Sequence, residues 1–90
     1  MKSNDIYKAI LALKNEDEVK AFFYDIMTPQ ENHALKERWE IVKALIEGKE
    51  SQRDIAKRLG SGIATVTRGN RTLKYGEGSL QTIYDRLKKK

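Results

Sequence analysis

The chain has 90 residues, no cysteine, one histidine and a formal net charge of +5. This length fits one small domain, and the composition offers neither a disulfide framework nor a metal site. No paired nucleophile and base is evident, so we do not expect an enzyme. No apolar run approaches the roughly twenty residues of a membrane span, and the first residues lack the apolar core of a signal peptide, which predicts a cytoplasmic protein.

The first half of the chain predicts three amphipathic helices. Apolar residues at helical spacing indicate a first helix over about residues 4–14 and a second from Asn15, which can cap it, to about Met27. The third helix begins at Thr28-Pro29-Gln30-Glu31, with threonine at the N-cap, proline at the first position and glutamate at the third, and stops at Gly48. We expect its apolar stripe to consist of Leu35, Trp39, Val42, Leu45 and Ile46.

The segment Ser51–Thr72 predicts a helix-turn-helix, whose second helix would enter the DNA major groove. Ser51 is a favourable N-cap with Asp54 three residues later, and Gly60 can supply the positive φ of the turn. The next helix would open at Ser61-Gly62. The expected inner residues of the two helices are Ile55, Ala56 and Leu59, then Ile63, Val66 and Gly69. An ordinary helical hairpin is the alternative.

The end of the chain predicts a loop over residues 74–78 and a sixth helix capped by Ser79. The helices together carry more apolar surface than a compact monomer of this size covers, which favours an intimate homodimer; the alternative is a monomeric bundle. We therefore expect one domain, 1–90, with residues 1–50 and 79–90 in the dimer core and 51–72 as the helix-turn-helix. No strand and no internal repeat are expected.

The charge changes sign along the chain. Residues 1–50 hold eight basic and ten acidic side chains, whereas residues 51–90 hold ten basic and three acidic ones. A basic half that contains the helix-turn-helix is the electrostatic footprint expected of a DNA-binding protein. A solvated basic surface without a partner is the alternative.

The segment from Thr28 to Lys74 resembles the Trp repressor family. The resemblance rests on TPQE, on ERWEIVKALIEGK, on SQRDIAKRLGSGIATVTRG and on LK, about half of the chain, and GSGIATVTRG at Gly60–Gly69 is its most specific block. It implies an all-α, six-helix, intertwined homodimer that binds an operator in double-stranded DNA as a transcriptional repressor, with L-tryptophan as corepressor and no other cofactor. The chain departs from the best-known members at Asn70-Arg71, where they have Ser-Asn, and at Thr72, where they have serine.

The resemblance also implies a ligand site. Two arginines would lie on either side of the indole ring, hydroxyl groups would contact the ligand, and a glycine would leave room for the ring. The matching positions are Thr28, Arg38, Thr65, Arg68, Gly69 and Thr72. Alternatives stay open: Arg68 as a phosphate contact, Arg38 in an ion pair with Glu37 or Glu40, and Thr28 as an N-cap alone.

The implied DNA contacts combine small residues at the start of the recognition helix with surrounding cations. They are Arg53, Lys57, Ile63, Ala64, Thr67, Arg71 and Lys74. Arg58 is a further candidate for the DNA backbone. Trp39 is expected in the core or at the dimer interface, and His33 is expected to be exposed. Three functions remain: a repressor that responds to L-tryptophan or a related ligand, a DNA-binding regulator without tryptophan dependence, and a helical protein-interaction module.

Overall fold

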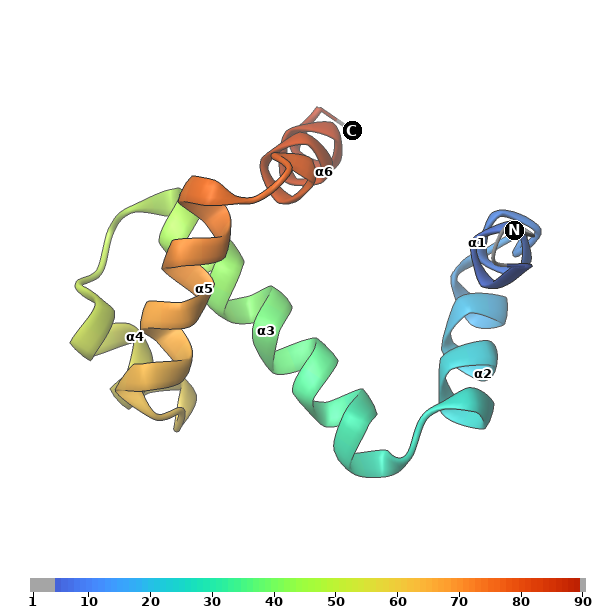
Figure 1. Cartoon of the computed structure of the whole chain (residues 1–90), viewed down its shortest axis with the longest axis horizontal. Helices are drawn as coiled ribbons and strands as arrows, with labels where there is room; N and C mark the ends of the chain where they lie inside the picture. Colours follow the sequence, from blue (N-terminus) through green and yellow to red (C-terminus); the bar gives the residue numbers. More distant parts are fainter. Residues whose placement is uncertain (1–4, 90) are drawn as a thin grey trace. The chain divides into compact units, whose positions relative to one another are not determined.

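The computed structural model describes residues 5–89, in two compact units whose boundary falls between Ala34 and Leu35. Within the described range the chain forms six helices and no strand (Figure 1). The six-helix, all-α prediction is therefore confirmed. None of these helices has the length and apolarity that crossing a bilayer requires.

The first unit contains α1 (Asp5–Leu11), α2 (Glu16–Ile26) and the start of α3 (Pro29–Glu47). The α2 start is a reciprocal cap, in which Asn15 Oδ1 accepts the Glu18 N–H at 2.9 Å and Glu18 Oε1 accepts the Lys14 N–H at 2.9 Å. Because Lys14 and Asn15 belong to this cap, α1 ends earlier than predicted. The predicted start of the first helix, at residue 4, lies outside the described residues.

The α3 start has the capping box that its sequence predicted. The Glu31 N–H donates to Thr28 Oγ1 at 3.1 Å, and the Thr28 N–H donates to Glu31 Oε1 at 2.9 Å. Two backbone donors that the helix itself cannot satisfy are thus paired. The other end of α3 is followed by Gly48 with φ 68°, a conformation that favours glycine.

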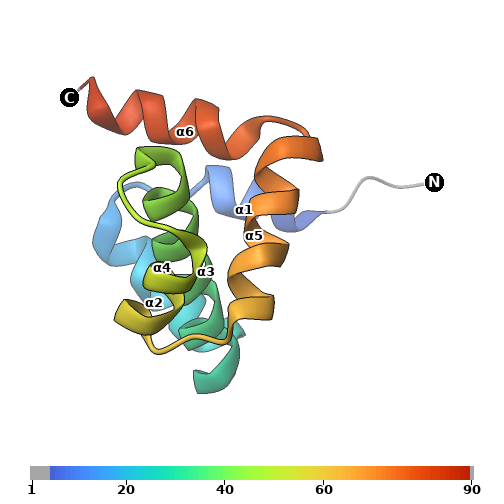
Figure 2. The same ribbon diagram turned by 90° about the vertical axis from the view of Figure 1, so that its left-hand side faces the viewer.

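The second unit contains the rest of α3, together with α4 (Gln52–Leu59), α5 (Ile63–Tyr75) and α6 (Ser79–Lys88). Helices α4 and α5 lie beside the C-terminal half of α3 (Figures 1 and 2). They enclose a small apolar core, with Leu45 and Leu59 at its edge. The core residues are Ile41, Ala44, Ile55, Ala56 and Val66.

The predicted stripe of α3 is right only in part: Val42 is buried and Leu45 packs against the core, but other residues of the buried face were not predicted. Ile41 is 1% exposed and Ala44 is 5% exposed, although neither was assigned to the stripe, whereas Leu35 is 37% exposed. The helix carries apolar side chains on more than one face, and α4 and α5 cover the face that presents Ile41 and Ala44. The short side chain of Ala44 allows the helices to approach closely at this face. The predicted stripe was chosen from the large apolar side chains and therefore left Ala44 out.

Three local predictions in the C-terminal half were wrong. The predicted loop starts too early, because α5 continues through Lys74 and Tyr75. Ser79 is the first residue of α6, and the N-cap is Gly78, whose φ of 84° favours glycine over a capping serine. Ile63 is 50% exposed, because it begins α5 at the turn, while Val66 one turn later is fully buried.

Candidate nucleic-acid interface and ligand site

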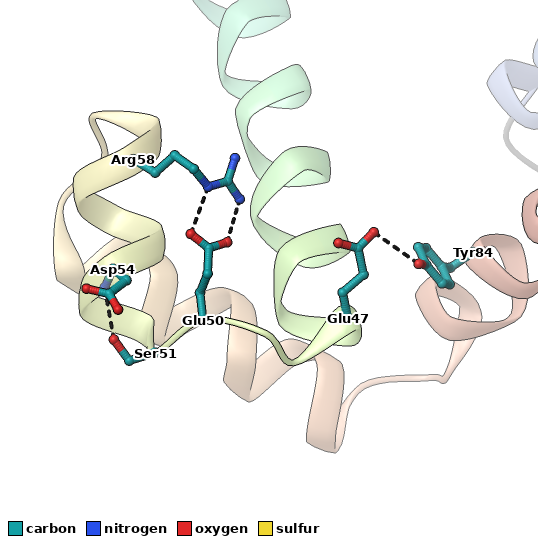
Figure 3. Close-up of polar contacts among 6 residues, drawn as sticks. All are labelled: Glu47, Glu50, Ser51, Asp54, Arg58 and Tyr84. Atoms are coloured by element: carbon teal, nitrogen blue, oxygen red, sulfur yellow. Dashed lines mark hydrogen bonds and ion pairs between the residues drawn. The ribbon is translucent and has the colours of Figure 1, made fainter.

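The first helix of the predicted helix-turn-helix, α4, starts at the residue expected. Ser51 has an extended backbone, and its Oγ accepts the Asp54 N–H at 3.0 Å (Figure 3). Ile55 and Ala56, four and five residues after this cap, are buried. The cap therefore sets the register that turns the apolar face of α4 to the core and its basic residues outward.

The turn between α4 and α5 is closed by Gly60 in the left-handed region, with φ 69° and ψ 28°. The Ser61 N–H donates to Ala56 O at 2.9 Å, across the end of α4. A side chain at Gly60 would meet no atom within 4 Å, so backbone conformation and not space favours glycine there. Gly60 thus has the role predicted for it.

The second helix, α5, is held against the rest of the unit by apolar and polar contacts. Val66 and Ile55 are each 0% exposed and belong to one core with Ile41. On the solvent side, Thr67 Oγ1 donates to Gln52 Oε1 at 2.9 Å, which connects the middle of α5 to the first turn of α4. The two helices are therefore fixed to each other on both sides of their contact.

A further polar contact joins the turn to α3. Ser61 Oγ donates a hydrogen bond to Glu37 Oε2, and both side chains are partly buried. Glu37 is 24 residues away from Ser61 in the chain. The contact connects the turn of the helix-turn-helix to the helix that carries Arg38.

The candidate DNA-binding residues all lie on the exposed surface of α4 and α5. The exposed set is Arg53, Lys57, Ile63, Ala64, Thr67, Arg71 and Lys74. Helix α5 contains no acidic residue, and within residues 5–89 no ion pair engages its three cations or Arg53 and Lys57. These charges are therefore available for phosphates.

Arg58, considered as a further phosphate contact, is instead engaged within the unit. Its Nε and Nη2 donate to the two Glu50 carboxylate oxygens at 2.8 and 2.7 Å (Figure 3). These hydrogen bonds, and then the attraction between the charges, hold the pKa of Glu50 below its ordinary 4.5 and raise the pKa of Arg58. The paired charge ties the loop before α4 to the end of that helix.

The α3 end also contacts α6. Tyr84 Oη donates to Glu47 Oε2 at 3.1 Å (Figure 3).

At the α5–α6 junction, a hollow of about 320 Å³ is lined by Thr72, Leu73 and residues 76–81. Of the candidate ligand residues it includes Thr72 and neither arginine, so this hollow is not the predicted sandwich.

Four of the candidate ligand residues share one stripe of α5, at helical spacing. They are Thr65, Arg68, Gly69 and Thr72. Arg38 and Arg68 are both exposed. Arg38 lies one turn before Ile41 on α3, and Gly69, which follows Arg68, approaches Ile41. The guanidinium groups therefore come from two neighbouring helices of one unit.

Gly69 lies on the inner side of α5, as the sequence predicted, and it packs against α3. A Cβ there would lie 3.2 Å from Ile41 Cγ2 and 3.6 Å from Leu45 Cδ1. The missing side chain thus lets α5 approach α3 closely. Thr28, in the first unit, uses its hydroxyl as the acceptor of the α3 cap.

Sequence reasoning missed the contacts that hold the interface in place. The hydrogen bonds of Gln52, Glu37 and Ser61 were not predicted, because hydrogen bonds between residues far apart in sequence leave no periodic signal. Trp39 is partly buried and His33 is exposed, the latter as predicted. The described residues contain no cluster of three or more His, Cys, Asp or Glu side chains able to hold a metal ion.

Comparison with known proteins identifies the family. The family model of the Trp repressor protein matches residues 2–88. A Trp operon repressor homologue from Vibrio vulnificus is 53% identical over 49 residues, which are 54% of this chain and 48% of that protein. The chain thus matches about half the length of this relative.

Two other similarities extend over nearly the whole chain. The uncharacterized protein YerC from Bacillus subtilis is 33% identical over 85 residues, 94% of this chain and 81% of YerC. The crystal structure of a TrpR-like protein from Eubacterium eligens has a TM-score of 0.86 and 38% identity, and covers 92% of this chain and 84% of its own. With the helix-turn-helix described above, these matches show that the chain belongs to the Trp repressor family.

Proposed function

We propose that this protein is a sequence-specific DNA-binding transcriptional regulator, and that it acts as a repressor responding to L-tryptophan or a related ligand. The main support is the helix-turn-helix itself, in which Gly60 in the left-handed conformation joins α4, capped by Ser51, to α5, which is anchored by the buried Val66. The exposed face of α5 carries basic residues, and the helix contains no acidic residue. Membership in a family of transcription regulators, not enzymes, supports the same function. A regulator of this kind acts on chromosomal DNA in the cytoplasm.

The start of α5 is suited to close approach to base edges. Ile63 and Ala64 are exposed and carry no charge, so they can lie near the groove without repelling it. Arg71 and Lys74, later on the same helix, would pair with phosphates and position the helix without reading sequence. The seven candidate DNA-binding residues thus divide into two groups. Uncharged residues at the start and middle of α5 would contact base edges, and the basic residues around them would contact phosphates.

We propose that the functional unit is a homodimer. Large apolar side chains are exposed in the first unit and on α6, among them Leu11 at 84%, Ile26 at 55% and Leu87 at 52%. Burying such side chains against a second copy would supply the apolar burial that the small core of one chain lacks. As in helix-turn-helix dimers generally, the Trp repressor among them, two recognition helices would then meet successive major grooves roughly 34 Å apart.

The proposed ligand mechanism is a population shift. A planar amino-acid ligand between Arg38 and Arg68 would contact α3 and α5 together and favour one orientation of the recognition helix. Coupling of this kind is typically on the order of 1–3 kcal/mol. Calorimetric titration of the protein with L-tryptophan tests it: binding heat and a thermal shift support a corepressor, and their absence contradicts it.

A second candidate is a DNA-binding regulator without tryptophan dependence. It is favoured by the replacement of Ser-Asn-Ser with Asn70-Arg71-Thr72, which changes two residues beside the candidate ligand site and one, Thr72, within it. The added arginine strengthens phosphate binding whether or not a ligand is present. DNA affinity that is equal with and without amino acids would select this candidate.

DNA binding itself is tested by selection from a pool of random-sequence duplexes. A sequence-specific dimer enriches a site with two-fold symmetry and half-sites about one helical turn apart. A protein that binds no duplex at low salt would be a helical protein-interaction module instead.

A further inference from the structure

We infer that Glu37 is a positioning residue for DNA binding, which acts through Ser61 to fix the turn that precedes the recognition helix. The inference rests on the proposed DNA-binding function, and it assigns a role to a residue that would not itself touch DNA. The observation behind it is the hydrogen bond that Ser61 Oγ, in the turn, donates to Glu37 Oε2, on α3.

The backbone hydrogen bond from the Ser61 N–H to Ala56 O holds the first half of the turn, and the residues after it are less restrained. Ser61 lies between Gly60 and Gly62, and glycine has the greatest backbone freedom of any residue. Gly62 is the N-cap of α5 and makes no side-chain capping hydrogen bond. The Ser61 side chain is therefore a second point, just before the first turn of α5, at which the turn can be held.

Glu37 holds the turn at this point from a rigid element. It lies in the interior of the 19-residue helix α3, one turn before the buried Ile41. The hydrogen bond joins residues 24 positions apart, and both side chains are partly buried, so water competes less for it than at the surface. Ile63 and Ala64, the candidate base-contacting residues, begin only two residues after Ser61.

The charge of Glu37 fits the same role. A carboxylate hydrogen-bonded beside the start of α5 is favoured by the positive end of that helix. The acidic group also lies near the surface proposed to face phosphates, where unpaired negative charge weakens binding. Simple electrostatics thus predicts that removing Glu37 strengthens DNA binding, whereas the positioning role predicts that its removal weakens binding.

The experiment measures affinity for the duplex selected with the wild-type protein, by fluorescence anisotropy, for Glu37→Ala, Glu37→Gln, Ser61→Ala and the Glu37→Ala/Ser61→Ala double variant. Glu40→Ala is the matched control: it removes the same charge from the same helix, where Glu40 pairs with Lys43 on the surface. Circular dichroism and thermal melting establish that each variant is folded at the assay temperature.

We expect Glu37→Ala and Ser61→Ala each to weaken binding about fivefold to tenfold, the equivalent of one net hydrogen bond. The double variant should lose no more than either single one. Glu37→Gln keeps an acceptor oxygen and should bind at least as tightly as wild type, and Glu40→Ala should not weaken binding. The slope of affinity against salt should be unchanged, because no phosphate contact is lost.

The inference is overturned if Glu37→Ala binds as tightly as Glu40→Ala, if the two single losses add, or if Glu37→Gln is as weak as Glu37→Ala. If Glu37→Ala does not fold, Ser61→Ala decides the question, because Ser61 is not part of the apolar core and loss of its hydroxyl leaves that core intact. Failure of the wild-type protein to select any duplex would instead refute the proposed function.

Discussion

Replacing Ile55 by alanine tests whether the small core holds the helix-turn-helix to α3. Ile55 is 0% exposed and belongs to one core with Ile41 and Val66. The change removes about three methylene-sized groups, at about 0.8 kcal/mol each for the transfer term. The cavity adds to this, so we expect a loss of about 3–4 kcal/mol, within the range of about 2–5 kcal/mol for such changes.

Ile63→Ala is the matched control, because it makes the same chemical change at a side chain that is 50% exposed. About half the transfer term and no closed cavity give an expected loss of about 1 kcal/mol. Urea unfolding followed by circular dichroism measures both, at one protein concentration, because association of chains would couple to stability. Equal losses for the two variants would refute the assignment of this core.

Three further outcomes are expected. The pKa of Glu50 is lowered in the folded state, so its ion pair with Arg58 stabilises the fold above the ordinary pKa of 4.5, and this contribution is lost as the pH falls through the folded-state pKa. The difference in stability between wild type and Glu50→Gln should therefore shrink between about pH 6 and pH 3 in thermal melts. A difference that stays constant over this range would contradict the ion pair. Lys74→Ala should lower the slope of log affinity against log salt by about one in anisotropy titrations, as expected for one lost phosphate contact; an unchanged slope would remove Lys74 from the interface. Arg68→Ala should weaken both L-tryptophan binding in calorimetry and DNA binding, and a loss of DNA binding alone would leave Arg68 as a phosphate contact.

Local chemistry explains what the sequence predicted correctly. Thr28 and Ser51 cap helices as expected, and Gly60 closes the turn, because these roles depend on a few neighbouring residues. Helix number follows from the same caps and from apolar spacing. The end of α5 was placed too early because Tyr75 continues the helix until Gly76, where a Cβ would lie 2.6 Å from Thr72 O.

Features that depend on contacts distant in sequence were not predictable in the same way. Which face of α3 is buried depends on where α4 and α5 pack, because α3 has apolar residues on more than one face. The burial of Ile41 therefore could not be predicted from the spacing along α3 alone. Gly69 matched a family ligand position, but its contact with Ile41 became evident only in three dimensions. The assignments of ligand and DNA contacts stay predictions, because the position of a residue in the fold does not show what it binds.

The most direct test of the proposed ligand-responsive regulator is the affinity of the wild-type protein for its selected duplex, with and without saturating L-tryptophan, at one salt concentration. Coupling through Arg38 and Arg68 predicts that affinity changes by about 5-fold or more. An identical affinity in the two titrations would contradict a tryptophan response and leave a regulator that binds DNA without it.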